Sequence, residues 1–288
     1  MPDLVSRFAR SWQLIQASRD VLRADNALLI LPALSGLATT ALAAGFLALA
    51  ISDGTFAAMR ESRSVNAIGP FYAWLFCWYV VQYFVVIFFN TALVGAAIAL
   101  LNGDRPTVGA ALKLALSRIG AILGYAVISA TVGVLLHALA ERLGVIGRLI
   151  EGAIGLAWTA ATFLVVPVLA AEDVGPWRAI ERSTALLRKT WGENLIGNAG
   201  ISLVMSVIFS AVGLVGFGGG MLLFQHGHPV LGAALLSAAI TTFLLVVLVA
   251  AALSAVYAAA VYYYAVVGRP PVDFDGDLIP GAFTHKGA

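Results

Sequence analysis

The sequence predicts an all-α polytopic membrane protein with six transmembrane helices, arranged as three units of an interfacial helix and a transmembrane hairpin. Three observations support this prediction. Of the 288 residues, 61% are hydrophobic and 11% are charged, whereas a soluble domain has about 25% charged residues. The apolar residues form long continuous runs without period-two alternation, which excludes a transmembrane β-barrel. The Lys and Arg residues gather in alternate connections between these runs.

Six apolar segments are long enough to cross about 30 Å of hydrocarbon at about 1.5 Å per residue. They are residues 27–51, a stretch within 69–101, 119–140, 149–171, 195–215 and a stretch within 230–267. The second and sixth stretches exceed one upright span, so we expect them to tilt or to project beyond the bilayer. Four glycines between Gly216 and Gly220 disfavour a helix after the fifth segment, and we expect a loop or a re-entrant turn there.

The distribution of basic residues predicts the orientation. The N-terminal segment, the loops 102–118 and 172–194, and the C-terminal tail together hold 13 of the 17 Lys and Arg residues. The loops 52–68 and 141–148 hold two each. Six spans put the first set on one side of the membrane and the second set on the other. The positive-inside rule therefore predicts a protein of the cytoplasmic (inner) membrane with both termini in the cytoplasm.

One basic stretch between two apolar runs, GPWRAIERSTALLRKTWGENL at 175–195, has the pattern of a helix lying in the membrane interface. Pro176 suits the first turn and Gly192 suits the end of such a helix. Its apolar residues recur at spacings of three and four, as on one helix face; they are Trp177, Ile180, Thr184, Leu187 and Trp191. The candidate contacts to lipid headgroups are Arg178, Arg182, Arg188 and Lys189.

A similar design recurs at 103–129, GDRPTVGAALKLALSRIGAILGYAVIS. When Pro106 is aligned with Pro176 and three residues are inserted, GYAVIS at 124–129 matches GNAGIS at 197–202 in four of six positions. The N-terminal segment is a weaker third copy. We therefore expect one membrane domain, 1–268, of three pseudo-repeats at about 1–101, 102–171 and 172–268, followed by a cytoplasmic tail, 269–288. The alternative is that any basic connection between spans resembles an amphipathic helix.

Three stretches together carry a resemblance to a known family: SWQLIQASRDVLRADNALLILPALSGL, FFNTALVGAAIALLNGDRPTVGAALKLAL and FLVVPVLAAEDVGPWRAIERSTALLRKTWGENL. They resemble a family of prokaryotic integral membrane proteins known as a domain of unknown function, over about residues 5–268. The resemblance implies six spans in the cytoplasmic membrane and assigns no catalytic residue. A looser likeness, through the SWQLI opening and the LPAL sequence, is to helix-plus-hairpin membrane proteins such as the sulfate-permease type.

Polar side chains inside the apolar segments are candidates for intramembrane contacts, because an amide or hydroxyl in hydrocarbon needs a hydrogen-bonding partner. One interpretation is a pore or substrate contact. The other is a hydrogen bond between helices, with a free energy of about 0.6–2 kcal/mol, and we favour it. The candidates are Gln82, Asn90, Thr91, Asn194 and Asn198.

No cofactor and no metal site is expected. The single cysteine, Cys77, cannot form an internal disulfide or a cysteine-based metal cluster. His226 and His228 lack a third ligand, and a polar turn explains them better. The sequence contains no phosphate-binding glycine motif, nucleophile elbow or HExxH motif. The net charge of +2 gives no indication of a nucleic-acid partner.

These observations favour a non-catalytic membrane protein that organises lipid, or a protein partner, through its cytoplasmic amphipathic helices. Membrane lipids are the expected partners, and a homo-oligomer or another protein partner stays open. The alternative function is a transporter or channel for a small solute or ion. Such a protein usually marks its path with intramembrane ionisable residues, which are nearly absent here.

Overall fold

The fold is all-α, as the sequence predicts. The computed structural model describes residues 27–52, 65–190 and 206–268, and these residues form helices and turns without any strand among them. Six helical segments of this part of the chain are long and apolar enough to cross a membrane. The predicted N-terminal interfacial helix and the predicted tail lie outside the described residues.

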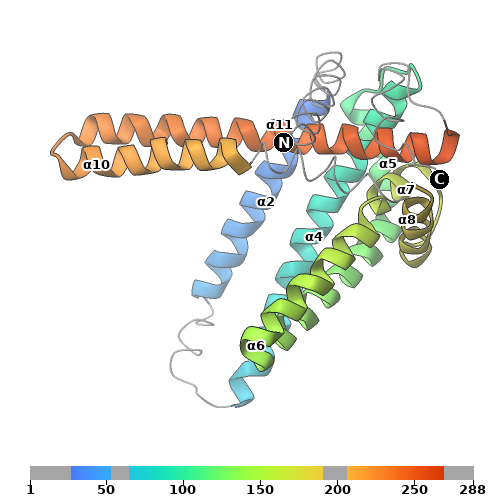
Figure 1. Ribbon diagram of the computed structural model, residues 1–288, viewed down its shortest axis with the longest axis horizontal. Helices are drawn as coiled ribbons and strands as arrows, with labels where there is room; N and C mark the ends of the chain where they lie inside the picture. The colour runs from blue at the N-terminus through green and yellow to red at the C-terminus, as the bar shows by residue number, and fades with distance from the viewer. Residues whose placement is uncertain (1–26, 53–64, 191–205, 269–288) are drawn as a thin grey trace, which may run out of the picture.

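Two long apolar helices, α2 (Ala27–Ser52) and α4 (Val65–Leu101), pack against each other. Their contact includes a ring cluster in which Phe46 meets Trp74 and Trp78 edge-on, at centroid distances of 5.9 and 5.1 Å. Such edge-to-face arrangements bring the positive ring edge to the negative ring face. In Figure 1 the two helices run beside each other through the lower half of the molecule.

The short helix α5 (Val108–Ser117) follows a turn at Gly103, whose φ of 89° suits a glycine. Thr107 begins the helix as its N-cap: its hydroxyl oxygen accepts a hydrogen bond from the Ala110 N–H at 3.2 Å. Leu114 of α5 lies directly over Gly95 of α4, where any larger side chain would collide with it. The missing Cβ therefore lets α5 lie close against α4.

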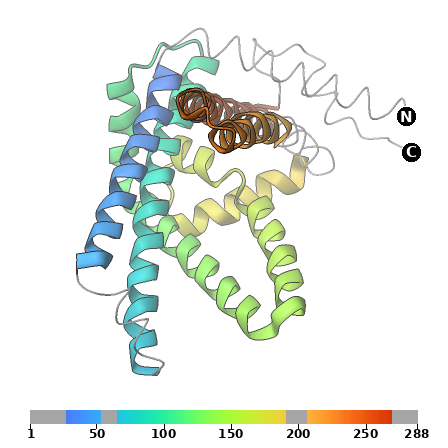
Figure 2. The ribbon, with the colours of Figure 1, turned by 90° about the vertical axis from the view of Figure 1, so that its left-hand side faces the viewer.

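Helix α6 (Ile119–Thr162) contributes two of the six apolar segments, Ile119–Ala140 and Gly147–Ala171, the second of which also takes in α7. Figure 2 shows that its two arms form a V that opens toward α7 and α8. The first arm has 22 residues, which at about 1.5 Å per residue gives about 33 Å. The first arm therefore matches one crossing of the hydrocarbon, and the second does so together with α7, as a segment of 25 residues.

The second arm of α6 is interrupted before it ends. Helix α7 (Val165–Ala171) begins after a break at Phe163 and Leu164. The break places Pro167 in the first turn of α7, where helix N–H groups have no intrahelical partner, so the missing proline N–H costs little. Helix α8 (Pro176–Thr190) then folds back against α6 and α7.

The last part of the described chain is a helical hairpin. Its first arm, residues 206–225, includes a π-helical turn, η1 (Gly213–Gly218), and α10 (Gly219–Gln225). Its second arm belongs to α11 (Pro229–Val267), which continues far beyond the hairpin. Gly227, with φ of 78°, forms the turn between the arms.

The prediction of a loop or re-entrant turn at Gly216–Gly220 is wrong, because these residues are helical. The glycines serve packing between the arms instead. A Cβ at Gly216 would collide with Ala239, and one at Gly220 would collide with Leu236. In hydrocarbon a backbone amide has no water to bond to, so the helix persists despite its glycines.

The buried core lies where the second half of α11 crosses α4. Residues 252–262 of α11 are buried except at Ser254, and α4, α5, α7 and α8 all contribute to the same core. Many of its members are alanines, including Ala92, Ala96 and Ala97 of α4. Small side chains let helix backbones approach closely, which is how helices associate in a membrane.

The direction of α11 differs from that of the other long helices. Figure 1 shows α10 and α11 running across the upper ends of α2, α4 and α6. In Figure 2, after a quarter turn, α10 and α11 are seen nearly end-on while α2 and α4 are still seen lengthwise. The hairpin thus projects sideways from the end of the bundle.

Candidate functional site

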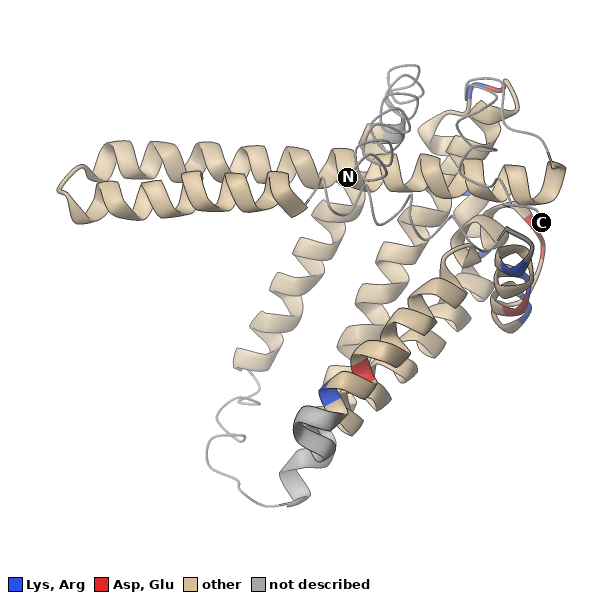
Figure 3. Ribbon diagram, viewed as in Figure 1, with Lys and Arg blue, Asp and Glu red and all other residues tan. Residues whose placement is uncertain are grey.

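Charged residues gather toward the two ends of the bundle (Figure 3). One end carries the charged residues of α8 and of the turns before α5 and α8, and charged residues of α6 stand toward the other. These include Arg148 and Glu151, at the start of the second arm of α6. The helices between these ends are almost free of charge, as expected for segments in hydrocarbon. The α8 end also holds a set of side chains, here called the polar cluster: Arg118, Glu172, Asp173, Arg182, Ser183 and Tyr262.

Ser183 of α8 closes the break between α6 and α7. Its hydroxyl accepts a hydrogen bond from the Leu164 N–H at 3.1 Å and donates one to the Ala161 carbonyl at 2.7 Å. The side chain is completely buried. A helix break inside a membrane protein leaves backbone N–H and C=O groups that must find hydrogen-bonding partners. The Ser183 hydroxyl is the partner of one N–H group and of one C=O group at this break. α8 is thereby fixed to the break.

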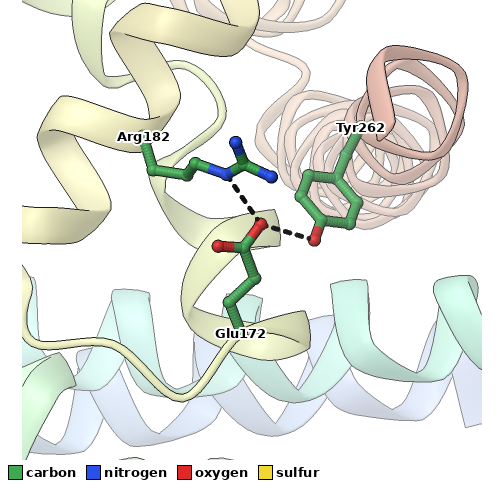
Figure 4. A network of polar contacts seen from close by, with 3 residues as sticks. All are labelled: Glu172, Arg182 and Tyr262. Atoms are coloured by element: carbon green, nitrogen blue, oxygen red, sulfur yellow. Dashed lines mark hydrogen bonds and ion pairs between the residues drawn. The ribbon is translucent and has the colours of Figure 1, made fainter. Parts of the chain in front are cut away.

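Glu172, which follows the last residue of α7, connects two further helices (Figure 4). Its Oε1 accepts a hydrogen bond from Arg182 Nε of α8 at 3.0 Å and another from the Tyr262 hydroxyl of α11 at 3.0 Å. The Glu172 side chain is 24% exposed and that of Arg182 is 43% exposed. A charge-assisted hydrogen bond in this half-buried setting is stronger than a neutral one.

Arg118, between α5 and α6, pairs with Asp173. Its side chain is mostly buried, whereas that of Asp173 is 91% exposed. The Arg118 Nε is buried and has no hydrogen-bond partner among the described residues. The pair connects the start of α6 to the segment between α7 and α8, so the polar cluster joins α5, α6, α7, α8 and α11 at one end of the bundle.

Helix α8 carries exposed cations. Arg178, Arg182 and Arg188 are exposed, although Arg182 also bonds Glu172, and the side chain of Lys189 lies outside the described residues. Glu181 is exposed among them. Trp177, at the start of the helix, is 63% exposed. The outer side of α8 thus combines several cations, one anion and a large amphipathic ring.

The side that α8 buries in the protein differs from the face that the sequence predicts to meet the membrane interface. The helix buries Ala179, Ser183, Leu186 and Leu187, which centre about a quarter of a turn away from the predicted face. Only Leu187 belongs to both sets. The reason is that α8 packs on α6, α7 and α11, so its most buried residues are small ones that fit between helices, while Trp177 stays outside.

The candidate intramembrane polar residues occupy different places. Gln82 Nε2 of α4 donates a hydrogen bond to the Thr39 carbonyl of α2 at 3.4 Å. Thr91 is completely buried, and its hydroxyl donates to the Ile87 carbonyl of its own helix at 2.8 Å. Asn90 is half-buried. Asn194 and Asn198 lie outside the described residues, and the structure does not bring the other three together as one site.

Sequence reasoning missed the roles of Ser183, Glu172 and Tyr262. Ser183 lies among apolar and charged residues whose helical pattern gives no sign of a buried hydroxyl. Glu172 stands next to Asp173 after an apolar segment, and such a pair of carboxylates predicts a solvated turn. The one available signal was Pro167, because a proline near the end of a span indicates a break that another side chain must satisfy.

The polar cluster has the chemistry of a structural joint with a cationic outer surface. Among the described residues no group of three or more His, Cys, Asp or Glu side chains is placed to hold a metal ion. The four hydrogen bonds of Ser183 and Glu172 described above are directed within the protein. The guanidinium groups of Arg178 and Arg188 of α8 are exposed, and such groups suit phosphate oxygens.

No curated protein matches the chain, and the looser likeness to sulfate-permease-type proteins finds no support. A sequence profile described as a family of unknown function (DUF6159) matches residues 69–272. The match covers more than two thirds of the chain and five of the six apolar segments. With its apolar helices this identifies a multi-pass membrane protein, and the chain belongs to the DUF6159 family of unknown function.

Proposed function

We propose that the protein is a non-catalytic organiser of anionic lipids in the cytoplasmic membrane, which it binds through the outer side of α8. Both termini lie in the cytoplasm in this proposal, as the distribution of Lys and Arg residues suggests. The partner is the anionic headgroup of the inner leaflet. An ammonium or guanidinium group near such a surface contributes about 1 kcal/mol of attraction.

The observation that carries the proposal is the fixed placement of the cations. Ser183 and Glu172 attach α8 to the bundle, while Arg178 and Arg188 remain exposed on its outer side. Binding groups that are already in position lose less conformational freedom when a ligand arrives. Glu181 on the same side reduces the net charge by one and keeps the attraction moderate.

Trp177 supports an interfacial position for this surface. Tryptophan is enriched at the boundary between headgroups and hydrocarbon, where its ring is in apolar surroundings and its N–H finds a polar partner. With 63% of its surface exposed, Trp177 has room for both contacts. The aromatic ring and the neighbouring guanidinium groups together match a lipid headgroup and the first part of its acyl chain.

The test compares lipid retention by the original chain and by three variants of it in nanodiscs of equal parts phosphatidylglycerol and phosphatidylcholine. After extraction into mild detergent, mass spectrometry counts the lipids that stay bound. Arg178→Gln/Arg188→Gln should lower the ratio of retained anionic to zwitterionic lipid several-fold. Arg178→Lys/Arg188→Lys keeps the charge and should retain most of the preference, and Arg148→Gln at the opposite end of the bundle should change little.

An unchanged lipid ratio in Arg178→Gln/Arg188→Gln would contradict the proposal. A fall of equal size in Arg148→Gln would show that the preference has no relation to α8. Protein-dependent flux of a small solute or ion into the same lipids would favour the alternative function of a transporter or channel.

A further inference from the structure

We propose that the hairpin formed by residues 206–225 and the first half of α11 lies within one leaflet of the membrane, parallel to its plane, surrounded by the acyl chains of that leaflet. Four apolar segments then cross the membrane, and the hairpin acts as a wedge on one side. This inference does not rest on the proposed binding of headgroups by α8.

The hairpin has no surface suited to water. Between Glu193 and Arg269 the sequence contains no Asp, Glu, Lys or Arg. Phe243, Leu244 and Leu245 are 38%, 57% and 58% exposed. Successive residues of a helix point in directions about 100° apart, so the exposed apolar side chains surround most of the helix. Hydrocarbon is the environment that fits such a surface.

The two arms form one body. A Cβ at Gly232 would lie 2.9 Å from the Gly220 carbonyl oxygen and 2.9 Å from Phe224 Cδ2. Phe209 and Phe243 add a ring contact between the arms at a centroid distance of 4.9 Å. Close backbone approach through small residues is the main source of helix association in lipid. The hairpin therefore takes its direction from α11.

The bundle fixes the direction of α11. Its second half is buried against α4, α7 and α8, and Tyr262 is bonded to Glu172. The helix has 39 residues, which gives about 58 Å, nearly twice the thickness of the hydrocarbon. An upright α11 would therefore extend one apolar half into water.

The charges define the membrane normal. Arg118 stands at the start of the first arm of α6, and Arg148 stands at the start of the second arm, beyond the bend that ends the first (Figure 2). The first arm has 22 residues, which is about 33 Å along the helix. That arm thus runs across the membrane, together with α2 and α4. α11 runs across the ends of these helices (Figures 1 and 2). A flat bilayer that these helices cross therefore cannot be crossed upright by α11 as well, so α11 lies in the plane of the bilayer.

The depth of the hairpin follows from its attachment. Tyr262, Tyr263 and Tyr264 of α11 lie at the end of the bundle that carries the polar cluster, and tyrosine is enriched in the interface. A helix is about 10 Å across, whereas one leaflet contributes about half of a 30 Å hydrocarbon core. The hairpin therefore fits below the headgroups of one leaflet and displaces lipid there only.

The position of the hairpin turn distinguishes this arrangement from a six-span protein. Both arrangements have an even number of crossings, so both place the termini on the same side. A spanning hairpin would bring His226 to the side of Arg148, whereas an in-plane hairpin keeps His226 in the leaflet of α8. The experiment uses full-length chains with one cysteine each: Cys77→Ala/His226→Cys, Cys77→Ala/Arg148→Cys and Cys77→Ala/Glu181→Cys.

A membrane-impermeant maleimide is applied to intact cells and to inverted membrane vesicles, and labelling is compared among the three variants. Position 226 should react from the side of position 181 or from neither side. Reaction from the side of position 148 would overturn the inference. A fluorophore attached through His226→Cys or Leu245→Cys, in the Cys77→Ala background, should also be quenched most by lipids brominated at the same depth. Clearly different depths for the two positions would overturn it as well.

Discussion

Replacing Ser183 by alanine tests how the polar cluster holds the bundle together. The substitution removes two hydrogen bonds, from the Leu164 N–H at 3.1 Å and to the Ala161 carbonyl at 2.7 Å. The site is completely buried, so water does not replace the lost partner. With about 1 kcal/mol for each hydrogen bond, the free energy of unfolding should fall by about 2 kcal/mol.

The matched control is Ser237→Ala. Ser237 makes the same kind of side-chain hydrogen bond, to the Ala233 and Ala234 carbonyls of its own helix, but its side chain is exposed and connects no second helix. Its removal should change stability by only a few tenths of a kcal/mol. The two variants therefore separate the loss of a hydroxyl from the loss of a joint between helices.

The assay is thermal or denaturant-induced unfolding in one mild detergent, followed by far-ultraviolet circular dichroism. A loss of about 2 kcal/mol corresponds to a fall in Tm of about 4–8 °C for Ser183→Ala. The Tm of Ser237→Ala should be close to that of the original chain. Equal Tm values for Ser183→Ala and Ser237→Ala would refute the reasoning, because they would show that the break between α6 and α7 does not depend on α8.

Two further predictions concern the attachment and the integrity of the hairpin. Tyr262→Phe removes the hydrogen bond to Glu172 and should lower the free energy of unfolding by about 1 kcal/mol; the loss should be smaller when Glu172→Gln is already present, as a double-mutant cycle in detergent can measure. Gly232→Leu places a side chain where the two arms touch and should destabilise the hairpin by about 1–3 kcal/mol, seen as faster hydrogen exchange. Gly213→Leu, at a glycine with open space around it, is the control, and equal exchange rates in both variants would count against close packing of the arms.

The helices themselves are largely predictable from the sequence, because hydrocarbon imposes a strong condition on each segment alone. Any segment that enters it must be apolar and must satisfy its own backbone. That condition locates α2, α4, both arms of α6 and most of α11. It also explains the error at Gly216, since helix propensities measured in water undervalue glycine in a segment that has no other way to pair its amides.

The candidate site is much less predictable. Arg178, Arg182 and Arg188 of α8 are exposed, since charge alone keeps them out of a core. The face that α8 buries in the protein was not predicted, because it depends on the neighbours that the helix meets, which hydrophobic periodicity does not contain. The joint formed by Glu172 and Tyr262 connects residues 90 positions apart, and only the crosswise path of α11 brings them together.

The most direct test of the proposed function uses Trp177 as a reporter of the lipids next to α8. The difference in fluorescence between the original chain and Trp177→Phe isolates this ring, and it is measured in vesicles that contain either brominated phosphatidylglycerol or brominated phosphatidylcholine at equal fractions. Binding of anionic lipid by Arg178 and Arg188 predicts stronger quenching by the brominated phosphatidylglycerol, and equal quenching in Arg178→Gln/Arg188→Gln. Equal quenching by the two lipids in the original chain would contradict the proposal.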